Sequence, residues 1–491
     1  MTTYFVDSRG GNDAFDGVTS STAWQTVERV NRGRYASGDE IRFAANQTFS
    51  GTLRLRGPEL GSLTVSSFGE GRATIDGGAS HGLAAEELHG LTVSTLIFKG
   101  VGRKSGNQQG RGVLLERCRR AVIRDVEALG FQRAGIEARK CEELEINRVY
   151  AHDNGFAGIL VSGSRIRVHH CRAINNPGDP TILNNHSGNG ILLSGADDSL
   201  VEYCEASGNG WDQPRGGQGN GPVGIWCHDS SGVTIQFCIA HHNKSTSGDG
   251  GGFDFDGGTR DSILQYNYSY ENHSCGYLVW EYGSQWPIAR NTIRYNVSIN
   301  DREGGVRIGK SGGQDVTQLW VYHNTIISPR DPCITLVGEW RVDRFLPELG
   351  MNQVFLWNNL LIGPKGGEIV KGTAEGRFQG NLYWSPDETF GVQGFSSLEA
   401  WRQATGQETL ENKPVGLFAD PKCQDARLLP QLDDPERLTE LFAVMLAPGS
   451  PAVDRGLDLQ ALFGIDAGQR DFFGNRAPSG GGPDIGAHEA G

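Results

Sequence analysis

Two aspartates stand one residue apart in the segment GGFDFDGG, where Asp254 and Asp256 alternate with Phe253 and Phe255. Aspartate is disfavoured inside β-strands, so two of them in one short strand-like run suggest that these carboxylates have a chemical task. A glutamate, Glu281, closes the related segment GYLVWE. Carboxylates held near one another can divide the roles of acid and base, or of acid and nucleophile. The question is whether the fold brings these three side chains together.

A Gly-apolar step recurs along the chain and predicts the elements that carry these residues. It occurs as RGVLLER, AGIEARK, AGILVSG, NGILLSG, VGIWCHD, GGFDFDG, CGYLVWE and GGVRIGK, and its third residue is Val113, Ile136, Ile159, Ile191, Ile225, Phe253, Tyr277 or Val306. Spacings of 23 to 34 residues are typical of a solenoid, in which each turn stacks on the previous one. Because each step is followed by a second short alternating run, the pattern predicts a parallel β-helix.

The second run gives an independent test of this stacking. Two sets of residues occupy the same place in it: Cys171, Cys204 and Cys238 in three successive runs, and Asn267, Asn296 and Asn324 in the next three. Equivalent residues of a parallel stack lie about 4.8 Å apart. We therefore expect the thiols to fill the core and the amides to form a hydrogen-bonded ladder.

Composition narrows the class of protein. The 491 residues include 71 glycines and only 3 methionines, which is typical of a turn-rich β protein. A net charge of −13 disfavours general binding to nucleic acid or to an anionic membrane. The N-terminal segment MTTYFVDSRGG lacks the features of a secretion signal, so we expect a cytoplasmic protein, or a secreted one if a leader has been removed.

The two ends of the chain and its repeated steps resemble a known superfamily. The opening YFVDSRGGNDAFDGVTSSTAWQTVERVN, the repeats, and the ending APGSPAVDRG with RDFFGNRAPSGGGPDIGAHE resemble the right-handed parallel β-helix superfamily of pectate lyase-like polysaccharide lyases and glycoside hydrolases. The resemblance implies an all-β, right-handed, single-stranded parallel β-helix. It places an N-terminal cap and first strands at 1–60, the β-helix at 61–384, and a C-terminal capping region at 385–491 over the open end. It does not select a reaction, since the superfamily contains lyases, hydrolases, epimerases and binding proteins.

Strand alternation assigns the candidate residues to faces. If Phe253 and Val306 point into the core, then Asp254, Asp256 and Arg307 point outward on one sheet. The outward residues expected on the neighbouring turns are Trp226 and His228 before them, and Leu278 and Trp280 after them. Carboxylates on adjacent turns would lie about 5 Å apart, near the roughly 5–5.5 Å of retaining glycosidases. The roughly 6.5–9.5 Å of inverting enzymes is also within reach of the side chains.

The acidic segment resembles the acidic turn of β-helix glycoside hydrolases, in which an aspartate on one turn works with a carboxylate on the next. This resemblance implies Asp254 or Asp256 as nucleophile or base and Glu281 as acid/base. The expected substrate-binding residues are Trp226, His228, Asp229, Asp249, Trp280, Tyr282, Arg307 and Lys310. The predicted function is hydrolysis of glycosidic bonds in an oligo- or polysaccharide, without a cofactor and without a nucleic-acid or membrane partner.

Two other interpretations fit the same residues. A uronate lyase would use Arg307 or Lys310 as the base of a β-elimination, with Asp249, Asp254 and Asp256 as ligands of Ca²⁺. A non-catalytic glycan-binding solenoid would use the same groove without turnover. Retaining hydrolysis, inverting hydrolysis, lysis and simple binding all remain open at this point.

Overall fold

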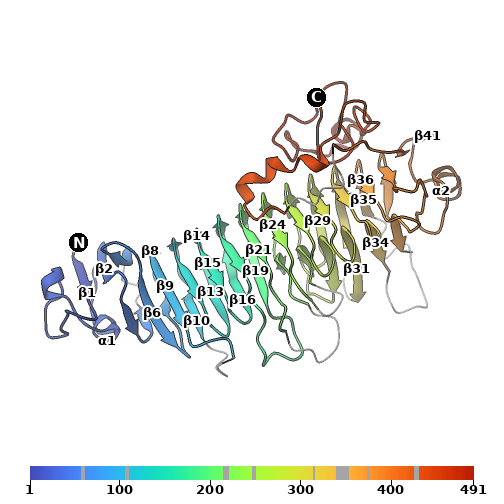
Figure 1. The fold of residues 1–491 in the computed structure, drawn as a ribbon. Helices are drawn as coiled ribbons and strands as arrows, with labels where there is room; N and C mark the ends of the chain where they lie inside the picture. Colours follow the sequence, from blue (N-terminus) through green and yellow to red (C-terminus); the bar gives the residue numbers. More distant parts are fainter. Residues whose placement is uncertain are drawn as a thin grey trace. The chain divides into compact units, whose positions relative to one another are not determined.

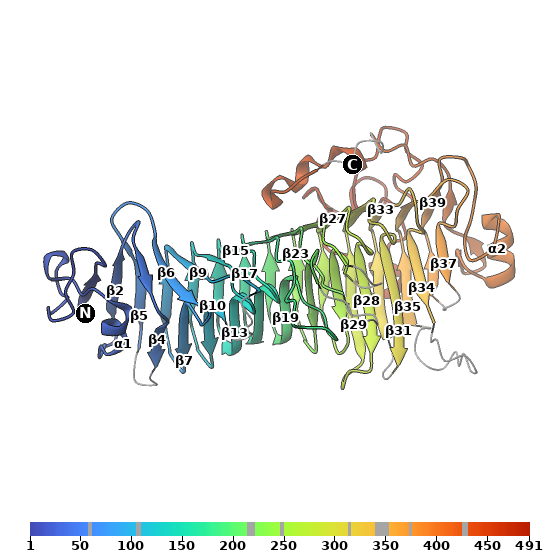
Figure 2. The ribbon, with the colours of Figure 1, turned by 60° about the horizontal axis from the view of Figure 1, so that its bottom comes forward.

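The structure, a computed structural model, describes residues 1–56, 61–104, 110–213, 221–245, 250–312, 316–338, 353–372, 376–424 and 431–491. The chain divides into two compact units, Met1–Ile225 with Lys244–Gly248, and Trp226–Asn243 with Asp249–Gly491. Each unit contains three parallel sheets, which we call sheets I, II and III (Figures 1 and 2). From β2 onward, neighbouring strands of a sheet are three strands apart in the sequence, because the chain visits the three sheets in turn. This is the parallel β-helix that the repeats predict.

The strands of the first unit are short and fall into the three sheets as follows. Sheet I holds β1 (Thr3–Val6), β2 (Asp39–Ala44), β5 (Leu63–Phe68), β8 (Leu91–Ser94), β11 (Val122–Arg124), β14 (Glu145–Asn147), β17 (Arg167–His169) and β20 (Leu200–Glu202). Sheet II holds β4 (Leu53–Arg56), β7 (Leu83–Glu86), β10 (Arg111–Glu116), β13 (Ala134–Glu142), β16 (Ala157–Ser164) and β19 (Asn189–Asp197). Sheet III holds β3 (Thr48–Ser50), β6 (Ala73–Gly78), β9 (Leu96–Gly100), β12 (Glu127–Leu129), β15 (Tyr150–His152), β18 (Arg172–Ile174) and β21 (Glu205–Ser207).

The second unit continues the same pattern. Sheet I holds β23 (Thr234–Gln236), β26 (Ile263–Gln265), β29 (Ile288–Arg294), β32 (Val316–Tyr322), β35 (Val354–Trp357) and β38 (Arg377–Gln379). Sheet II holds β22 (Ile225–His228), β25 (Phe253–Asp256), β28 (Tyr277–Tyr282), β31 (Val306–Gly312), β34 (Ile334–Val337) and β37 (Val370–Gly372). Sheet III holds β24 (Ile239–His241), β27 (Tyr268–Tyr270), β30 (Val297–Ile299), β33 (Thr325–Ile327), β36 (Leu360–Ile362), β39 (Leu382–Trp384) and β42 (Leu417–Phe418).

Few helices accompany the sheets in the part of the chain that the structure describes. These are α1 (Val27–Asn31), α2 (Leu398–Thr405), α3 (Leu459–Phe463) and the 3₁₀ turns η1 (Ser20–Thr22), η4 (Pro435–Glu440) and η5 (Phe442–Val444). In addition, β40 (Thr409–Leu410) pairs with β41 (Lys413–Pro414) as a small hairpin. Within the described ranges, no helix is long and apolar enough to cross a membrane.

The apolar residues that mark the repeat form the inner face of sheet II, as predicted. The residues in register are Val113, Ile136, Ile159 and Ile191 in the first unit and Phe253, Tyr277 and Val306 in the second. All of them are at most 1% exposed. Strand alternation on sheet II can therefore be used to place the neighbouring side chains.

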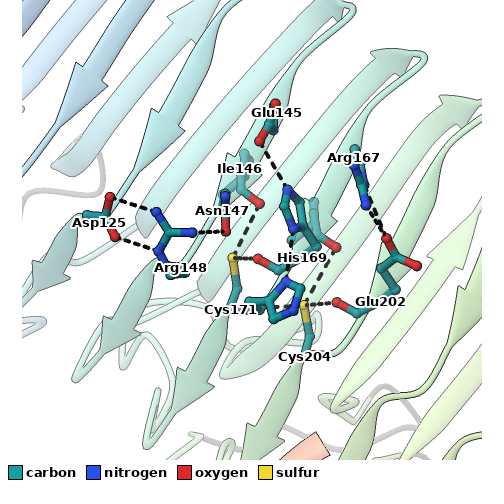
Figure 3. A network of polar contacts seen from close by, with 12 residues as sticks. Asp125, Glu145, Ile146, Asn147, Arg148, Arg167, His169, Cys171, Glu202 and Cys204 are labelled. Atoms are coloured by element: carbon teal, nitrogen blue, oxygen red, sulfur yellow. Dashed lines mark hydrogen bonds and ion pairs between the residues drawn. The ribbon is translucent and has the colours of Figure 1, made fainter. Parts of the chain in front are cut away.

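Cysteines fill the corner between sheets I and III in the first unit. The chain bends there at one residue in the left-handed conformation, His170 (φ 52°) or Tyr203 (φ 50°), and the next residue is a fully buried cysteine. The N–H of Cys171 donates to the Sγ atom of Cys204 at 3.4 Å (Figure 3). None of the nine cysteines forms a disulfide. The predicted core position of Cys171 and Cys204 is confirmed.

The same corner in the second unit carries the predicted asparagine ladder. The backbone N–H and the Nδ2 atom of Asn267 donate to Oδ1 of Asn296 at 3.0 and 3.1 Å, and Asn296 makes the same two bonds to Asn324. Two further rungs, Asn359 and Asn381, extend the ladder beyond the predicted residues. Each amide thereby satisfies a buried donor of the preceding turn, which an apolar side chain cannot do.

A buried glutamate ends this ladder. Glu408 is fully buried and accepts hydrogen bonds from Nδ2 of Asn381 at 2.8 Å, from the Tyr383 hydroxyl at 2.7 Å and from the Gly380 N–H at 2.6 Å. Burial raises the pKa of Glu408 from 4.5 to about 7, because removal from water outweighs the donors that favour the carboxylate.

The stability of the protein is expected to depend on the protonation of Glu408. The folded chain binds this proton more tightly than the unfolded chain, so the stabilisation is complete below pH 4.5 and is lost as the pH rises through about 7. In this window the free energy of unfolding of the wild type should fall by up to about 1.4 kcal/mol per pH unit relative to Glu408→Gln. Denaturant unfolding of both proteins across the window measures this, and a difference that does not change with pH would contradict it.

The C-terminal region packs mainly along a flank of the second unit. Trp401 of α2 is fully buried against Phe378 and Tyr383 of the last strands, so α2 does cover the end of the sheets. Residues further on cover the outer side of sheet III instead (Figure 1). The residues that meet in this layer are Tyr268, Tyr270, Val297, Leu360 and Leu382 from the sheet and Leu432, Leu441, Phe472 and Ile485 from the C-terminal region. The residues that follow α2 thus pack on sheet III of the second unit.

Candidate active site

The two aspartates of β25 lie on the outer face of sheet II. Phe253 and Phe255 are fully buried on the inner face, and alternation turns Asp254 and Asp256 the other way. On the next strand, Asp254 pairs with Leu278 and Asp256 with Trp280, in the predicted register. Asp254 is only 2% exposed, whereas Asp256 is partly exposed. Asp256 is therefore the more accessible of the two carboxylates on this face.

Strand β22 brings two aromatic rings to the same face. The rings of Trp226 and His228 lie 5.4 Å apart, which places both side chains on the outer side of the strand. Nδ1 of His228 lies 2.9 Å from Oδ2 of Asp229, and the Asp229 N–H donates to the carbonyl of Gly257 at 2.8 Å, directly after Asp256. Trp226 is 3% exposed, so it supports the face, while His228 and Asp229 lie at its surface.

Glycines keep space for the side chains around the aspartates. A Cβ atom on Gly257 would lie 2.6 Å from the Tyr282 ring, and one on Gly258 (φ +75°) would lie 2.6 Å from Oδ1 of Asp229. One on Gly309 would lie 2.4 Å from the Trp280 ring. Gly257 and Gly258 therefore leave room for Tyr282 and Asp229 beside the strand that carries Asp256, and Gly309 lets the Trp280 ring lie over β31.

Trp280 and Arg307 lie together on the downstream side. The Arg307 guanidinium lies 5.5 Å from the centre of the Trp280 ring and forms an ion pair with Glu303 at 2.8 Å. The Trp280 Nε1 atom donates to Ser311 at 3.2 Å. Arg307 faces outward as predicted, although part of its charge is balanced by Glu303.

Glu281, the predicted acid/base, does not lie on the outer face with Asp254 and Asp256. Glu281 is fully buried, and alternation along β28 places it on the same side as Tyr277 and Val279 rather than with Trp280. Its Oε1 atom accepts hydrogen bonds from the N–H groups of Gly283 and Ser284 at 2.6 and 2.8 Å, so the carboxylate holds the turn after β28.

Lys310, predicted to act on the outer face with Arg307, also lies on the inner side of its strand. It pairs in register with Glu281, is 7% exposed, and has the parity of the buried Ile308 rather than that of Arg307. Arg307 and Lys310 therefore do not point to the same face of the sheet.

Tyr282 lies near more of the acidic residues of the site than its predicted role in substrate binding implies. Its side chain is 44% exposed, and burial of the rest raises the pKa of its hydroxyl. Nearby carboxylates raise this pKa further, in the order Asp256, Asp229, Glu281 and Asp254. A phenol among carboxylates stays protonated and can donate a hydrogen bond. The sequence already indicated this position. Trp280 pairs with Asp256, and Tyr282 lies two residues after Trp280 on the same strand.

The described residues contain no cluster of three or more His, Cys, Asp or Glu side chains arranged to hold a metal ion. These residues are 1–56, 61–104, 110–213, 221–245, 250–312, 316–338, 353–372, 376–424 and 431–491. Asp249, a predicted substrate-binding residue and Ca²⁺ ligand, lies outside these ranges.

Comparison with known proteins agrees with the fold. A family model described as "Right handed beta helix region" matches residues 111–293 and 218–341. The fold is a right-handed parallel β-helix. Among curated proteins, a lacto-N-biosidase of Bifidobacterium longum subsp. longum is 29% identical over 124 residues, which is 25% of this chain and 7% of the relative. The match thus spans only a small part of that protein.

Two solved structures are similar to this chain at low sequence identity. The GH136 lacto-N-biosidase from Eubacterium ramulus is 17% identical, with 80% of this chain and 68% of that chain covered and a TM-score of 0.49. The pectate lyase Pel9A is 14% identical, with 100% and 96% covered and a TM-score of 0.41.

Proposed function

We propose that this protein is a carbohydrate-active enzyme that hydrolyses glycosidic bonds. The observation that carries the proposal is the pair Asp254 and Asp256 on the outer face of β25, bordered by Trp280, Tyr282 and His228. Asp is costly in a strand unless its position serves a purpose. The local similarity to a lacto-N-biosidase supports a glycan substrate and cleavage by hydrolysis.

Asp256 and Asp254 are proposed as the reacting carboxylates. Residues two apart on a strand lie about 6.6 Å apart at a rise of about 3.3 Å per residue. That spacing falls in the roughly 6.5–9.5 Å range in which a water molecule fits between the two groups of an inverting enzyme. Asp254 then gives a proton to the glycosidic oxygen, and Asp256 takes a proton from the water that attacks the anomeric carbon.

The neighbouring side chains would orient the sugar. The partly exposed Trp280 ring offers an apolar surface for a sugar ring, and the Tyr282 hydroxyl can donate to Asp256 or to a substrate oxygen. His228, held by Asp229, borders the other side of Asp256. Glu281 is replaced in this proposal by Asp254, because the Glu281 carboxylate lies on the inner side of β28 and is held by the turn, whereas Asp254 lies on the outer face.

A uronate lyase is the second candidate, and the outward Arg307 favours it. An Arg beside an aromatic ring suits the carboxylate of a uronate, and Asp249 with Asp254 and Asp256 would then supply oxygen ligands to Ca²⁺. The buried Lys310 is a poor base for this reaction.

A glycan screen with product analysis separates these functions. The panel would contain aryl lacto-N-bioside, neutral oligosaccharides, polygalacturonate and alginate, each with and without a chelator. We expect new reducing ends without the ultraviolet absorbance of an unsaturated sugar, and no effect of the chelator. Unsaturated, chelator-sensitive products would establish the lyase, and binding without turnover of any member would refute both enzymes.

A further inference from the structure

A cavity lies on the outer face of sheet I in the second unit, on a different sheet from Asp254 and Asp256. Its volume is about 670 Å³, within the roughly 300–1,000 Å³ of small-molecule sites. Its walls come from β32, β35, β38, the β40–β41 hairpin and the segment that ends α3. Neither the site described above nor its proposed chemistry uses any of these residues.

Near-parallel aromatic rings form one wall of this cavity. Trp320 on β32 pairs in register with Phe355 on β35, and the two rings are 6.4 Å apart with an angle of 13° between their planes. Trp357 adds a ring 4.9 Å from Phe355, and Phe463 stacks on Trp357 at 4.5 Å. Trp320 and Phe355 are only partly buried. The wall thus offers flat apolar surface to a ligand.

Polar groups complete the cavity. Arg377 pairs in register with Phe355, so it continues the row of Trp320 and Phe355 onto β38. The side chains of Arg377, Gln353 and Glu411 are exposed, and none of them forms a hydrogen bond or ion pair with the described part of the chain. Together they offer both donors and acceptors, and their two charges cancel.

The buried wall contains one more polar group. The Trp357 side chain is 3% exposed, and its Nε1 atom meets no acceptor within the residues that the structure describes. A buried indole N–H normally has a partner. Because Trp357 lines the cavity, this N–H is an unused donor within the cavity wall.

We infer that this cavity is a second saccharide-binding site, separate from the proposed catalytic face, and that it takes a neutral oligosaccharide. A pyranose has apolar C–H faces that pack on aromatic rings, and its hydroxyl groups both donate and accept hydrogen bonds. Arg377, Gln353 and Glu411 match the hydroxyls, and the balanced charge disfavours an anionic ligand. Such a site would hold one part of a long glycan while another part reacts.

Calorimetric titration of the full-length chain tests this inference. In the Asp256→Asn background, which prevents turnover, neutral cello-, xylo- and chito-hexaose and an anionic trigalacturonate would serve as probes. Stacked aromatic contacts contribute about 0.5–1.5 kcal/mol, so Trp320→Ala should weaken a neutral probe about 2- to 13-fold. Arg377→Ala, an exposed change that leaves the rings intact, should weaken it as well.

The controls separate this site from the catalytic face. Phe442→Ala removes a ring that is 56% exposed and lies outside both sites, and it should leave the affinity unchanged. If neutral probes bind but only Trp280→Ala weakens them, or if no neutral probe binds, the second site is refuted. The glycan screen on the wild type judges the proposed hydrolysis independently of these results.

Discussion

Asp256→Asn is expected to reduce kcat by about 10²–10⁴-fold while the protein stays folded. The amide keeps the shape of the side chain but cannot take a proton from water. Asp256 is the partly exposed member of the pair, and its backbone carbonyl accepts hydrogen bonds from Thr259, which fixes the strand end independently of the carboxylate. The change should therefore act on the chemistry and leave the free energy of unfolding within about 1 kcal/mol of the wild type.

The matched control is Asp198→Asn. Asp198 is exposed in a turn with φ 48°, a conformation that Asn adopts readily, so this variant should keep full activity. Asp254→Asn should lose activity as Asp256→Asn does, since both carboxylates are needed. Rates within a factor of two of the wild type for Asp256→Asn would exclude Asp256 as a reacting group.

The repeat pattern in the sequence was sufficient to predict which residues of sheet II point inward and which point outward. The Gly-apolar step fixed the inner residues of sheet II, and from these the outward positions of Asp254, Asp256 and Arg307 followed. The asparagine ladder was equally visible, because equal spacing of one residue type in a parallel stack brings the side chains together. These features depend only on local patterns that repeat.

The predicted positions of Glu281 and Lys310 failed because the alternation of side chains along the strands was not applied to them. Glu281 directly follows the outward Trp280, and Lys310 is three residues from the outward Arg307, so both have the parity of the inner face. They were assigned to the site by residue type instead. The turn that binds Glu281 includes Gly283 at φ +104° and a register shift after Glu281, neither of which a strand pattern encodes.

The packing of the C-terminal region could not be predicted from the sequence for a different reason. Its segments pack on sheet III through contacts between residues far apart in the sequence, such as the Tyr270 hydroxyl with the Leu432 carbonyl at 3.1 Å. No repeat relates the two partners. Only the outward tyrosines of β27 gave a hint, since Tyr268 and Tyr270 are large apolar surfaces that need a cover.

Glu281→Ala is expected to destabilise the protein by about 1–3 kcal/mol, although no reacting group is touched. The buried backbone N–H of Ser284 would lose its acceptor, at about 1–3 kcal/mol, whereas the N–H of the exposed Gly283 can bond to water instead. The Ser284 hydroxyl, which also lies 2.6 Å from the Trp286 carbonyl, would keep one partner. Denaturant unfolding should show a lower transition midpoint with an unchanged slope.

Glu281→Gln tells the structural role from a catalytic one. Its side-chain oxygen can still accept from both N–H groups, and its amide can donate to the Ser284 hydroxyl, so most of the stability should return. Because the carboxylate at this position is buried and already engaged by the turn, activity should return with the fold. A stable Glu281→Gln protein that is as inactive as Asp256→Asn would instead make Glu281 the acid/base, and Asp254 would lose that role.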